Sequence, residues 1–261
     1  MPPLPYEPWA GEGESFPVFH PASLPEPEGP PPPEDAPLPA VAPQEPLPLL
    51  TATVTMCRRL PLFIQTMDSL LQNLEDRALI AEWIAIDDGS SAANLAEVAR
   101  RYPFLRLMIH QGRGHAGALN ELFRQVKTRY LFHFEDDWLF LTPGRMLTQC
   151  LAVLRADPVL GQVSLRGYGG ELREPTDVPA HYIHQHPPSH WPGYSLNPGV
   201  QDMNKVRQAG EFPAESGFEY RFARQFHVLG HRVAYLKPPA DCQWIRHLGQ
   251  VSDYNLNETR R

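Results

Sequence analysis

The sequence of 261 residues predicts an α/β fold, a Rossmann-like mixed and mostly parallel sheet flanked by helices. From residue 49 onward, short apolar segments alternate with segments whose apolar residues recur at helical spacing. Two of the apolar segments, Trp83–Ile86 and Tyr130–Phe134, run directly into acidic residues. Parallel strands that carry polar side chains at their carboxyl ends are typical of sheets with a ligand crevice at that edge.

The expected elements follow one another along the chain. In the first half, strands are expected at 49–56, 80–86, 105–110 and 130–137, and helices at 60–74, 92–101 and 116–126. In the second half we expect helices at 144–156 and 217–229, and strands at 162–166, 233–236 and 243–247. Residues 167–198 are rich in Gly, Pro, His and aromatic residues, and a loop of this length in a compact domain is usually functional.

The first 48 residues differ from the rest in composition. They contain 17 of the 30 prolines and 8 of the 30 acids, and neither lysine nor arginine. Such a segment buries too little apolar surface to offset the entropy of ordering, so we expect a disordered, acidic, Pro-rich arm over 1–48. The folded domain is then expected at 49–253, followed by a flexible tail at 254–261.

The charge of the remaining chain narrows the class of function. Residues 49–261 carry all 23 Lys and Arg against the other 22 acids, so the net charge of −7 resides in the arm. This balance argues against a nucleic-acid-binding protein, which would show a basic face. The three scattered cysteines suit a reducing compartment, and neither a signal peptide nor an apolar run of membrane-spanning length is present. We therefore expect a cytoplasmic protein without a transmembrane segment.

Two acidic clusters follow predicted strands. Glu135, Asp136 and Asp137 come after one strand, and Asp87 and Asp88 come after another, with Gly-Ser next in the chain. Adjacent carboxylates repel one another unless a cation is present, so the pattern indicates a site for a divalent metal and an anionic ligand such as a nucleotide diphosphate. The alternatives are a turn and helix start for the first pair and a solvated strand end for the triplet.

A glycine-rich turn offers a competing hypothesis. Residues 112–117 spell G-x-G-x-x-G between a predicted strand and a predicted helix, with acids about twenty residues further on. This is the pattern of a dinucleotide-binding fingerprint. However, two strand–helix units precede it, whereas that fingerprint usually opens its domain. A dinucleotide-dependent oxidoreductase therefore remains an alternative.

Taken together, these motifs resemble glycosyltransferase family 2, whose members are inverting enzymes of the GT-A fold. The resemblance covers about residues 49 to 253. Its elements occur in the expected order: the strand 51–55, the run 87–90, the segment with Gly114, Ala118 and Asn120, and the D-x-D motif at 135–137. Here the motif begins with Glu, so which carboxylates contact the ion stays open.

The resemblance implies roles for individual residues. For the donor nucleotide and its diphosphate it implies contacts from Thr55, Asp87, Asp88, Arg113, Gly114 and Asp136. For Mn²⁺ or Mg²⁺ it implies Glu135, Asp137 and a C-terminal histidine, His247. Arg246 is a further candidate for the diphosphate. The implied donor is a UDP- or GDP-type sugar nucleotide, and the implied acceptor is a saccharide, lipid-linked or other hydroxyl compound.

Glu219 is the candidate catalytic base, because the family places an acid about eleven residues before a helix-ending glycine and Gly230 fits that spacing. An inverting transfer needs a carboxylate to accept the proton of the attacking hydroxyl. The structural alternative is a capping box, in which Ser216 and Glu219 satisfy backbone N–H groups at a helix start. If Glu219 is only a cap, Glu215 becomes the candidate base.

The histidine-rich segment also allows two interpretations. His181, His184, His186 and His190 lie within ten residues, which invites a zinc site, but their spacing fits no standard structural zinc pattern. The resemblance places the acceptor side here, where Tyr182, Trp191 and Tyr194 could stack on a sugar ring. We therefore expect an acceptor loop.

The sequence thus predicts a metal-dependent inverting glycosyltransferase of the hexosyltransferase type. A dinucleotide-dependent oxidoreductase is one alternative. A non-catalytic sugar-nucleotide-binding module is another, with the Pro-rich arm recruiting a partner.

Overall fold

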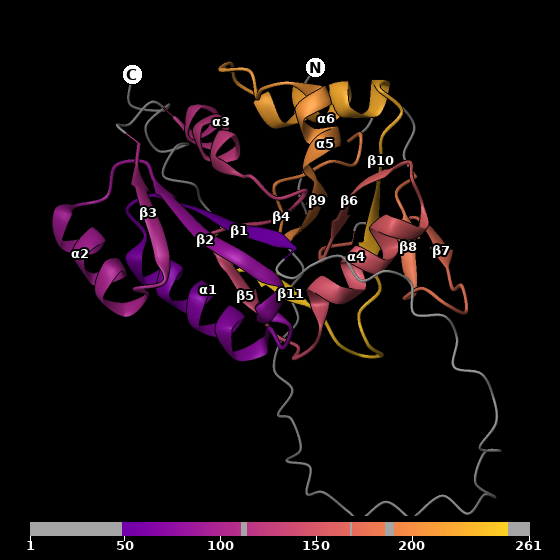
Figure 1. Ribbon diagram of the computed structural model, residues 1–261, viewed down its shortest axis with the longest axis horizontal. Coiled ribbons are helices and arrows are strands. Elements are labelled where there is room, and N and C mark those ends of the chain that lie inside the picture. Colours follow the sequence, from indigo (N-terminus) through magenta and orange to yellow (C-terminus); the bar gives the residue numbers. More distant parts are fainter. Residues whose placement is uncertain (1–48, 111–113, 168, 186–190, 250–261) are drawn as a thin grey trace, which may run out of the picture. The chain divides into compact units, whose positions relative to one another are not determined.

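A computed structural model of the chain describes residues 49–110, 114–167, 169–185 and 191–249 (Figure 1). The predicted arm at 1–48 and tail at 254–261 lie outside these residues, as does Arg113. The first half of the described chain contains β1 (Leu50–Met56), α1 (Leu60–Asn73), the 3₁₀ helix η1 (Arg77–Leu79), β2 (Ile80–Asp87), α2 (Ala92–Arg101), β3 (Leu105–Ile109), α3 (His115–Gln125), β4 (Tyr130–Glu135) and β5 (Trp138–Phe140). The second half contains α4 (Met146–Ala156), β6 (Leu160–Ser164), β7 (Glu171–Arg173), β8 (His181–Ile183), β9 (Gly199–Asp202), α5 (Met203–Ala209), α6 (Phe218–Val228), β10 (Arg232–Leu236) and β11 (Ile245–His247).

Local sequence explains where several helices begin. In α1, Pro61 lies in the first turn, where its missing N–H costs nothing, and Phe63, Met67 and Leu70 form the buried face. The hydroxyl of Ser91 caps α2 by accepting the N–H of Asn94 at 3.2 Å. These signals are local, which is why both helices lie where the sequence predicts them.

Nine strands of the described chain form one sheet, in the order β3-β2-β1-β4-β9-β6-β10-β8-β7. β3, β2, β1 and β4 are parallel. β9 is antiparallel to both β4 and β6, and β10 is parallel to β6. β4, β6 and β10 therefore run in the same direction, and all three have their carboxyl ends at one edge. The predicted mixed, mostly parallel α/β sheet is confirmed.

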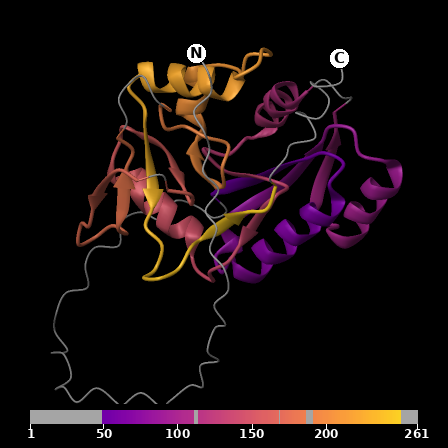
Figure 2. The ribbon, with the colours of Figure 1, turned by 180° about the vertical axis from the view of Figure 1, so that it is seen from behind.

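Helices cover both faces of the sheet (Figures 1 and 2). Because strand side chains alternate between faces, Leu50, Ala52 and Val54 of β1 pack into one core with α1, α2 and α4. Ile84 and Ile86 of β2 point the other way, into a second core with α3, α5 and α6.

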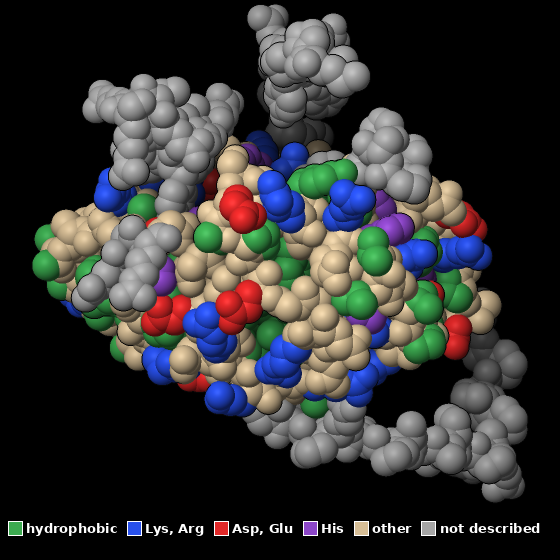
Figure 3. Space-filling model, turned by 90° about the horizontal axis from the view of Figure 1, so that it is seen from above, with side chains coloured by type: hydrophobic (Ala, Val, Ile, Leu, Met, Phe, Trp, Pro, Cys, Tyr) green, Lys and Arg blue, Asp and Glu red, His purple; other side chains and the backbone are tan. Residues whose placement is uncertain are grey.

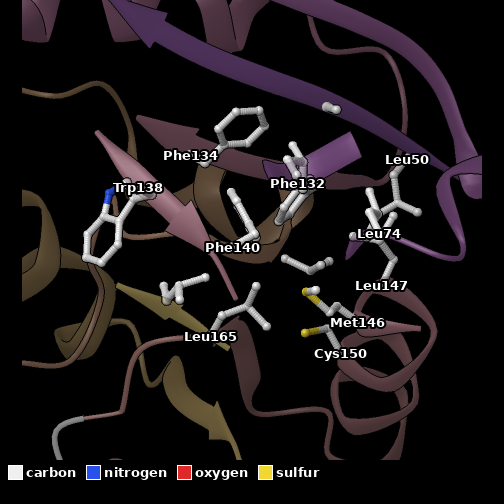
Figure 4. Close-up of a cluster of buried hydrophobic side chains, with 14 of the residues drawn as sticks. Leu50, Leu74, Phe132, Phe134, Trp138, Phe140, Met146, Leu147, Cys150 and Leu165 are labelled. Carbon is white, nitrogen blue, oxygen red and sulfur yellow. The ribbon is translucent and has the colours of Figure 1, made fainter. Parts of the chain in front are cut away.

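One core holds the acidic turn after β4 in place (Figure 4). Phe132 and Phe134 of β4 contact each other with ring centroids 5.3 Å apart, and the Phe140 ring of β5 meets Phe134 edge-on at 5.9 Å. Trp138, which opens β5, is 1% exposed. The turn that carries Asp136 and Asp137 is thus fixed at both ends by buried aromatic side chains.

The strand order defines where a ligand crevice can form. From β1 the chain moves through β2 to β3 on one side and then returns to β4 on the other, so a topological switch point lies between β1 and β4. The register places Thr55 opposite Glu135 and Met56 opposite Asp87. Both acidic clusters therefore reach the same edge of the sheet.

Several predicted elements differ from the structure. The strand expected at 130–137 ends at Glu135, because the chain turns through the next two residues and returns as β5. Residues 167–198, expected as loop, contain the short strands β7 and β8. β9 and α5 were not predicted, since a four-residue strand and a seven-residue helix depend on sheet and core contacts rather than on local periodicity.

Charged side chains of both signs are interspersed on the face seen in Figure 3. Exposed ion pairs are present among the described residues, such as Arg124 with Glu211, whose nitrogen and oxygen lie 2.7 Å apart. This arrangement agrees with the near balance of charge that the sequence shows for residues 49–261.

We predict that Phe132→Ala lowers the free energy of unfolding by about 4 kcal/mol, because it leaves a cavity between β4 and β5. The matched control is Phe104→Ala. Phe104 is 45% exposed and keeps only edge contacts such as that with Trp83, so about 1 kcal/mol is expected. Urea unfolding of both variants measures the difference, and equal losses would contradict this account of the core.

Candidate active site

A pocket of about 360 Å³ lies at the carboxyl ends of β1, β2 and β4. We call it the acidic pocket, because five carboxylates are in its lining. Its described lining includes seven of the predicted site residues, namely Thr55, Asp88, Glu135, Asp136, Asp137, Glu219 and His247. Asp87 and Gly114 lie beside the pocket rather than in its lining, and Arg113 is outside the described residues. The fold thus brings residues together that are up to 192 positions apart in the sequence, from Thr55 to His247.

Arg59 is the main counter-charge in this pocket. It lies three residues after the end of β1, and its guanidinium donates to the carboxylate of Asp136 and, at 2.9 Å, to Oδ2 of Asp137. The sequence analysis did not identify Arg59. The signal was present, because two consecutive arginines follow a strand whose carboxyl end lies at the edge where the acids gather.

One guanidinium does not neutralise the cluster. Burial raises the pKa of Asp136 to about 7, although Arg59 and the backbone N–H of Cys57 act in the opposite direction. The pKa of Glu135 is raised well above its ordinary value, first by burial and then by the neighbouring charges of Asp137, Glu219 and Asp136. The ionised forms of Glu135 and Asp136 are therefore disfavoured, and additional positive charge in the acidic pocket would stabilise them.

Asp137 differs from its neighbours. Burial alone would raise its pKa, but the hydrogen bond from His247 and the charge of Arg59 outweigh burial and lower it. The Nε2 atom of His247 lies 3.3 Å from Oδ2 of Asp137, and Oδ1 of Asp137 is buried without a hydrogen-bond partner among the described residues. Gly249 lies directly against this carboxylate, where a Cβ atom would collide with it.

The donor set suits a divalent cation. Glu135, Asp137 and His247 offer oxygen and imidazole ligands of the kind that Mn²⁺ accepts, and Oδ1 of Asp137 is buried without a hydrogen-bond partner among the described residues. Among the described residues, however, no three His, Cys, Asp or Glu side chains already converge on one point. The ligand atoms of these residues are therefore of the kinds that a divalent metal accepts. Two of the carboxylates in the pocket, Asp136 and Asp137, are bonded to Arg59.

Asp87 and Asp88 occupy different environments. Oδ2 of Asp87 accepts the backbone N–H groups of Gly89 and Ser90 at 3.0 and 2.8 Å, which closes the turn after β2. Asp88 lines the acidic pocket. Its carbonyl accepts a hydrogen bond from the thiol of Cys57 at 3.1 Å, and burial raises the pKa of that thiol to about 11.

Glu219 lies in the first turn of α6, but it is not part of a capping box. The helix is preceded by Gly217 with a φ of 72°, and no side chain caps it, so the predicted contact of Ser216 is absent. Instead, Oε1 of Glu219 accepts the backbone N–H of Leu196 at 2.8 Å. Burial raises the pKa of Glu219 despite this bond. Glu215 is exposed and lies 3.6 Å from Arg221, outside the described lining of the pocket.

Two residues of α3 contact the segments that carry Glu219 and Glu135. The side chain of Asn120 accepts the N–H of Phe212 and donates to its carbonyl, both at 2.8 Å, and so fixes the segment that leads to α6. His115 places Nε2 3.5 Å from Oε1 of Glu135. Burial lowers the pKa of His115 to about 4, so its imidazole is neutral at neutral pH. Gly114, with a φ of 88°, occupies the position before the helix.

The histidine-rich segment has mostly structural contacts. His184 lies between the Tyr235 hydroxyl at 2.6 Å and the Trp191 carbonyl at 3.0 Å, while His186 and His190 lie outside the described residues. The predicted stacking of Tyr194 on a sugar is wrong. Its side chain is fully buried and its hydroxyl donates to Gln201 at 2.9 Å.

Comparison with models of known protein families identifies one whose description is "Glycosyl transferase family 2", matched over residues 51–207. This range runs from β1 through α5 and includes four of the five carboxylates of the acidic pocket. The chain belongs to glycosyl transferase family 2. The glycosyltransferase resemblance predicted from the motifs is therefore confirmed.

Solved glycosyltransferase structures share the fold of this family 2 member. The mannosyltransferase PcManGT from Pyrobaculum calidifontis, in complex with GDP-Man and Mn²⁺, is 20% identical with a TM-score of 0.55, covering 82% of this chain and 61% of its own. GalNAc-T7 with UDP, GalNAc and Mn²⁺ is 13% identical with a TM-score of 0.57, covering 78% and 45%. TarS from S. aureus is 14% identical with a TM-score of 0.54, covering 79% and 38%.

At these identities the likeness establishes the fold, and the predicted GT-A fold is confirmed. This member of glycosyl transferase family 2 spans between 38% and 61% of the lengths of those three chains. The comparison with curated proteins finds no match. None of the helices in the described part of the chain combines the length and apolar character needed to cross a membrane.

We predict that Arg59→Gln destabilises the metal-free protein by about 3 kcal/mol at pH 8, because it leaves two buried carboxylates without their cation. Removing Arg59 raises the folded-state pKa of Asp136 further above about 7. A carboxyl whose pKa is raised on folding loses its contribution to stability as pH rises through that pKa, so the deficit should shrink at pH 5.5.

The matched control is Arg58→Gln, since the exposed Arg58 side chain donates only to the Gly89 carbonyl at 3.1 Å. Arg58→Gln should lower the free energy of unfolding by less than about 1 kcal/mol at both pH values. Urea unfolding in the presence of a chelator measures both variants. A deficit for Arg59→Gln that does not change with pH contradicts the assigned role.

Proposed function

We propose that the chain transfers a hexose from a nucleoside diphosphate donor to a hydroxyl group of an acceptor, with inversion at the anomeric carbon. One observation carries this proposal: the acidic pocket contains a half-buried carboxylate, Glu219, that is separate from the cluster at Glu135–Asp137. A proton acceptor and an anion-binding site that needs cations are the two parts that such a transfer requires.

The donor is proposed to bind across the carboxyl ends of β1, β2 and β4. We assign its nucleoside and diphosphate contacts to Thr55, Asp87, Asp88, Arg113, Gly114 and Asp136. The position of the acidic pocket at the topological switch point between β1 and β4 supports this placement, as does the presence of Asp88 in the pocket lining. PcManGT was solved with GDP-Man and GalNAc-T7 with UDP, which supports a donor of the GDP or UDP type.

Glu135, Asp137 and His247 are proposed to hold Mn²⁺ or Mg²⁺. A bound ion at this position supplies Lewis-acid stabilisation of the diphosphate leaving group. His247 and Arg59 keep Asp137 ionised, and the short strand pair of β5 and β11 fixes His247 opposite Trp138. The Mn²⁺ in the PcManGT and GalNAc-T7 structures supports a divalent ion.

Glu219 is proposed to act as the base. Its carboxylate accepts the proton of the acceptor hydroxyl while that oxygen forms a bond to the anomeric carbon. The bond from this carbon to the diphosphate oxygen breaks, and its electron pair leaves with the nucleoside diphosphate. A single displacement from the opposite face gives inversion. The raised pKa of Glu219 favours proton uptake, and its bond to the Leu196 N–H fixes its orientation.

We predict that Glu219→Gln lowers kcat by about 10²- to 10⁴-fold while the protein stays folded. Glutamine keeps the oxygen that accepts the Leu196 N–H, but it cannot accept a proton. In the unmodified protein, kcat/KM should fall as pH drops through the raised pKa of Glu219, because the protonated carboxyl is not a base. Sugar transfer or nucleotide release over a pH series gives both quantities.

Glu215→Gln is the control for this variant, because Glu215 is an exposed acid close by in sequence and outside the described pocket lining. Its turnover should stay within about twofold. Near-normal turnover of Glu219→Gln together with inactive Glu215→Gln would reverse the assignment.

We also predict that UDP or GDP with Mn²⁺ raises the melting temperature and that NAD(H) does not. At about 100 times the dissociation constant, the ligand adds about 2.7 kcal/mol, or roughly 5–10 °C. Asp137→Asn should lose most of this shift, whereas Asp177→Asn, at an exposed position, should retain it. A shift with NAD(H) alone would favour an oxidoreductase, and nucleotide binding without any transfer would favour a non-catalytic module.

A further inference from the structure

Arg59 is bonded to one of the residues that are proposed to hold the divalent ion. Its guanidinium spans Asp136 and Asp137, and Nη1 donates to Oδ2 of Asp137 at 2.9 Å. Asp137 is also a proposed ligand of Mn²⁺ or Mg²⁺. The protein thus supplies a cation of its own to a carboxylate that the ion needs.

The oxygen that Arg59 contacts is the one that faces a second proposed ligand. Nε2 of His247 lies 3.3 Å from Oδ2 of Asp137, so the carboxylate oxygen and the imidazole nitrogen are already side by side. Nη1 of Arg59 approaches this same oxygen. A guanidinium at this oxygen compensates its negative charge and repels a second cation, so it opposes binding of a divalent ion there.

Gly249 encloses this contact. A Cβ atom at Gly249 would collide with Oδ2 of Asp137 and would lie 3.0 Å from Nη1 of Arg59. Asp137 is buried, and its backbone carbonyl accepts the N–H of Leu248 at 2.7 Å, which keeps the chain close on this side. Because close packing leaves little space around Oδ2, an ion at this oxygen takes the place of Nη1 rather than adding to it.

Arg59 keeps an anchor when it releases Asp137. Another nitrogen of the guanidinium donates to Oδ1 of Asp136, and Oδ2 of Asp136 accepts the backbone N–H of Cys57 at 3.2 Å. Nε of Arg59 is buried and has no hydrogen-bond partner among the described residues. Once Nη1 is released, two nitrogens of the guanidinium have N–H groups available to another acceptor.

The diphosphate of the proposed donor suits these N–H groups. Arg59 is the one arginine or lysine in the described lining of the acidic pocket, and its side chain is partly exposed there. It lies in the turn after β1, at the switch point where the donor is proposed to bind. Guanidinium groups bind phosphate oxygens through charge-assisted hydrogen bonds, and a diphosphate beside carboxylates needs such compensation.

We propose that Arg59 yields Asp137 to the divalent ion and that its guanidinium then binds the donor diphosphate. Arg59 holds Asp137 while the ion is absent and becomes available to the nucleotide when the ion is bound. This inference rests on the proposed function, because it names a further donor-binding residue for that reaction.

Binding of Mn²⁺ to the full chain without nucleotide tests the first step. Electron paramagnetic resonance of free Mn²⁺ gives the affinity. Arg59→Gln should bind Mn²⁺ about tenfold more tightly than the unmodified protein, because no guanidinium competes for Asp137. Arg59→Lys, whose point charge cannot span both carboxylates, should show a gain of about threefold, and it provides the measurement if Arg59→Gln does not fold.

Calorimetric titration of UDP or GDP, with Mn²⁺ saturating, tests the second step. Arg59→Gln should weaken the nucleotide by about tenfold or more, since it removes a charge-assisted hydrogen bond to the diphosphate. Arg59→Lys should weaken it less, because a cation remains. The matched control is Arg58→Gln, which removes an exposed arginine outside the described lining of the pocket and should change neither affinity.

Opposite shifts of the two affinities distinguish this role from damage to the fold, which would weaken both ligands. The inference is overturned if the Arg59 variants bind Mn²⁺ no more tightly than the unmodified protein, or if they bind UDP and GDP with Mn²⁺ equally well. Failure of the proposed function gives a different result. In that case no sugar is transferred from any donor, whereas the opposite shifts in Mn²⁺ and nucleotide affinity persist.

Discussion

Repulsion among five carboxylates in one pocket, of which Asp88, Asp136 and Asp137 are buried, is the constraint on which the rest of the site depends. Asp88, Glu135–Asp137 and Glu219 line one pocket, and Arg59 is the one arginine or lysine in its described lining. The fold must therefore deliver compensating groups from distant parts of the chain. The turn from β1 to α1 places Arg59 against Asp136 and Asp137, and β11 pairs with β5 so that His247 reaches Asp137. The pKa values of Glu135 and Asp136 are nevertheless raised, mainly by burial and further by neighbouring carboxylates.

The environment divides these carboxylates by role. Asp137 lies between Arg59 and His247, and its pKa is lowered although burial opposes this. Glu219 is half-buried and accepts the Leu196 N–H, and desolvation raises its pKa despite this bond. Two carboxyl groups in one pocket whose pKa values shift in opposite directions suit different chemistry. An ionised Asp137 suits the holding of a cation, whereas Glu219 suits the uptake of a proton.

The sequence predicted most of the first half of the fold, because those elements depend on local signals. Tyr130–Phe134 is an apolar run long enough to identify a buried strand, and the acids after it mark the edge of the sheet. The sequence did not reveal contacts made only by folding. The contact of Arg59 with the acids after β4 depends on the register of β1 against β4, which the sequence does not reveal. Ser216 does not cap α6, because Gly217 precedes the helix in the left-handed conformation. Tyr194 has the composition of a sugar-stacking residue, but burial under α6 removes it from any ligand.

The pairing of β5 with β11 connects distant parts of the chain at the acidic pocket. Trp138 and His247 are opposite each other in this pair, although 109 positions separate them in the chain. The same contact brings His247 into the lining of the acidic pocket, with its Nε2 atom 3.3 Å from Oδ2 of Asp137. Arg246, the residue before it in β11, alternates to the other face of the strand and is not in the described lining of this pocket. The register of this two-stranded sheet therefore decides that an imidazole, and not a guanidinium, lies beside Asp137 from this strand.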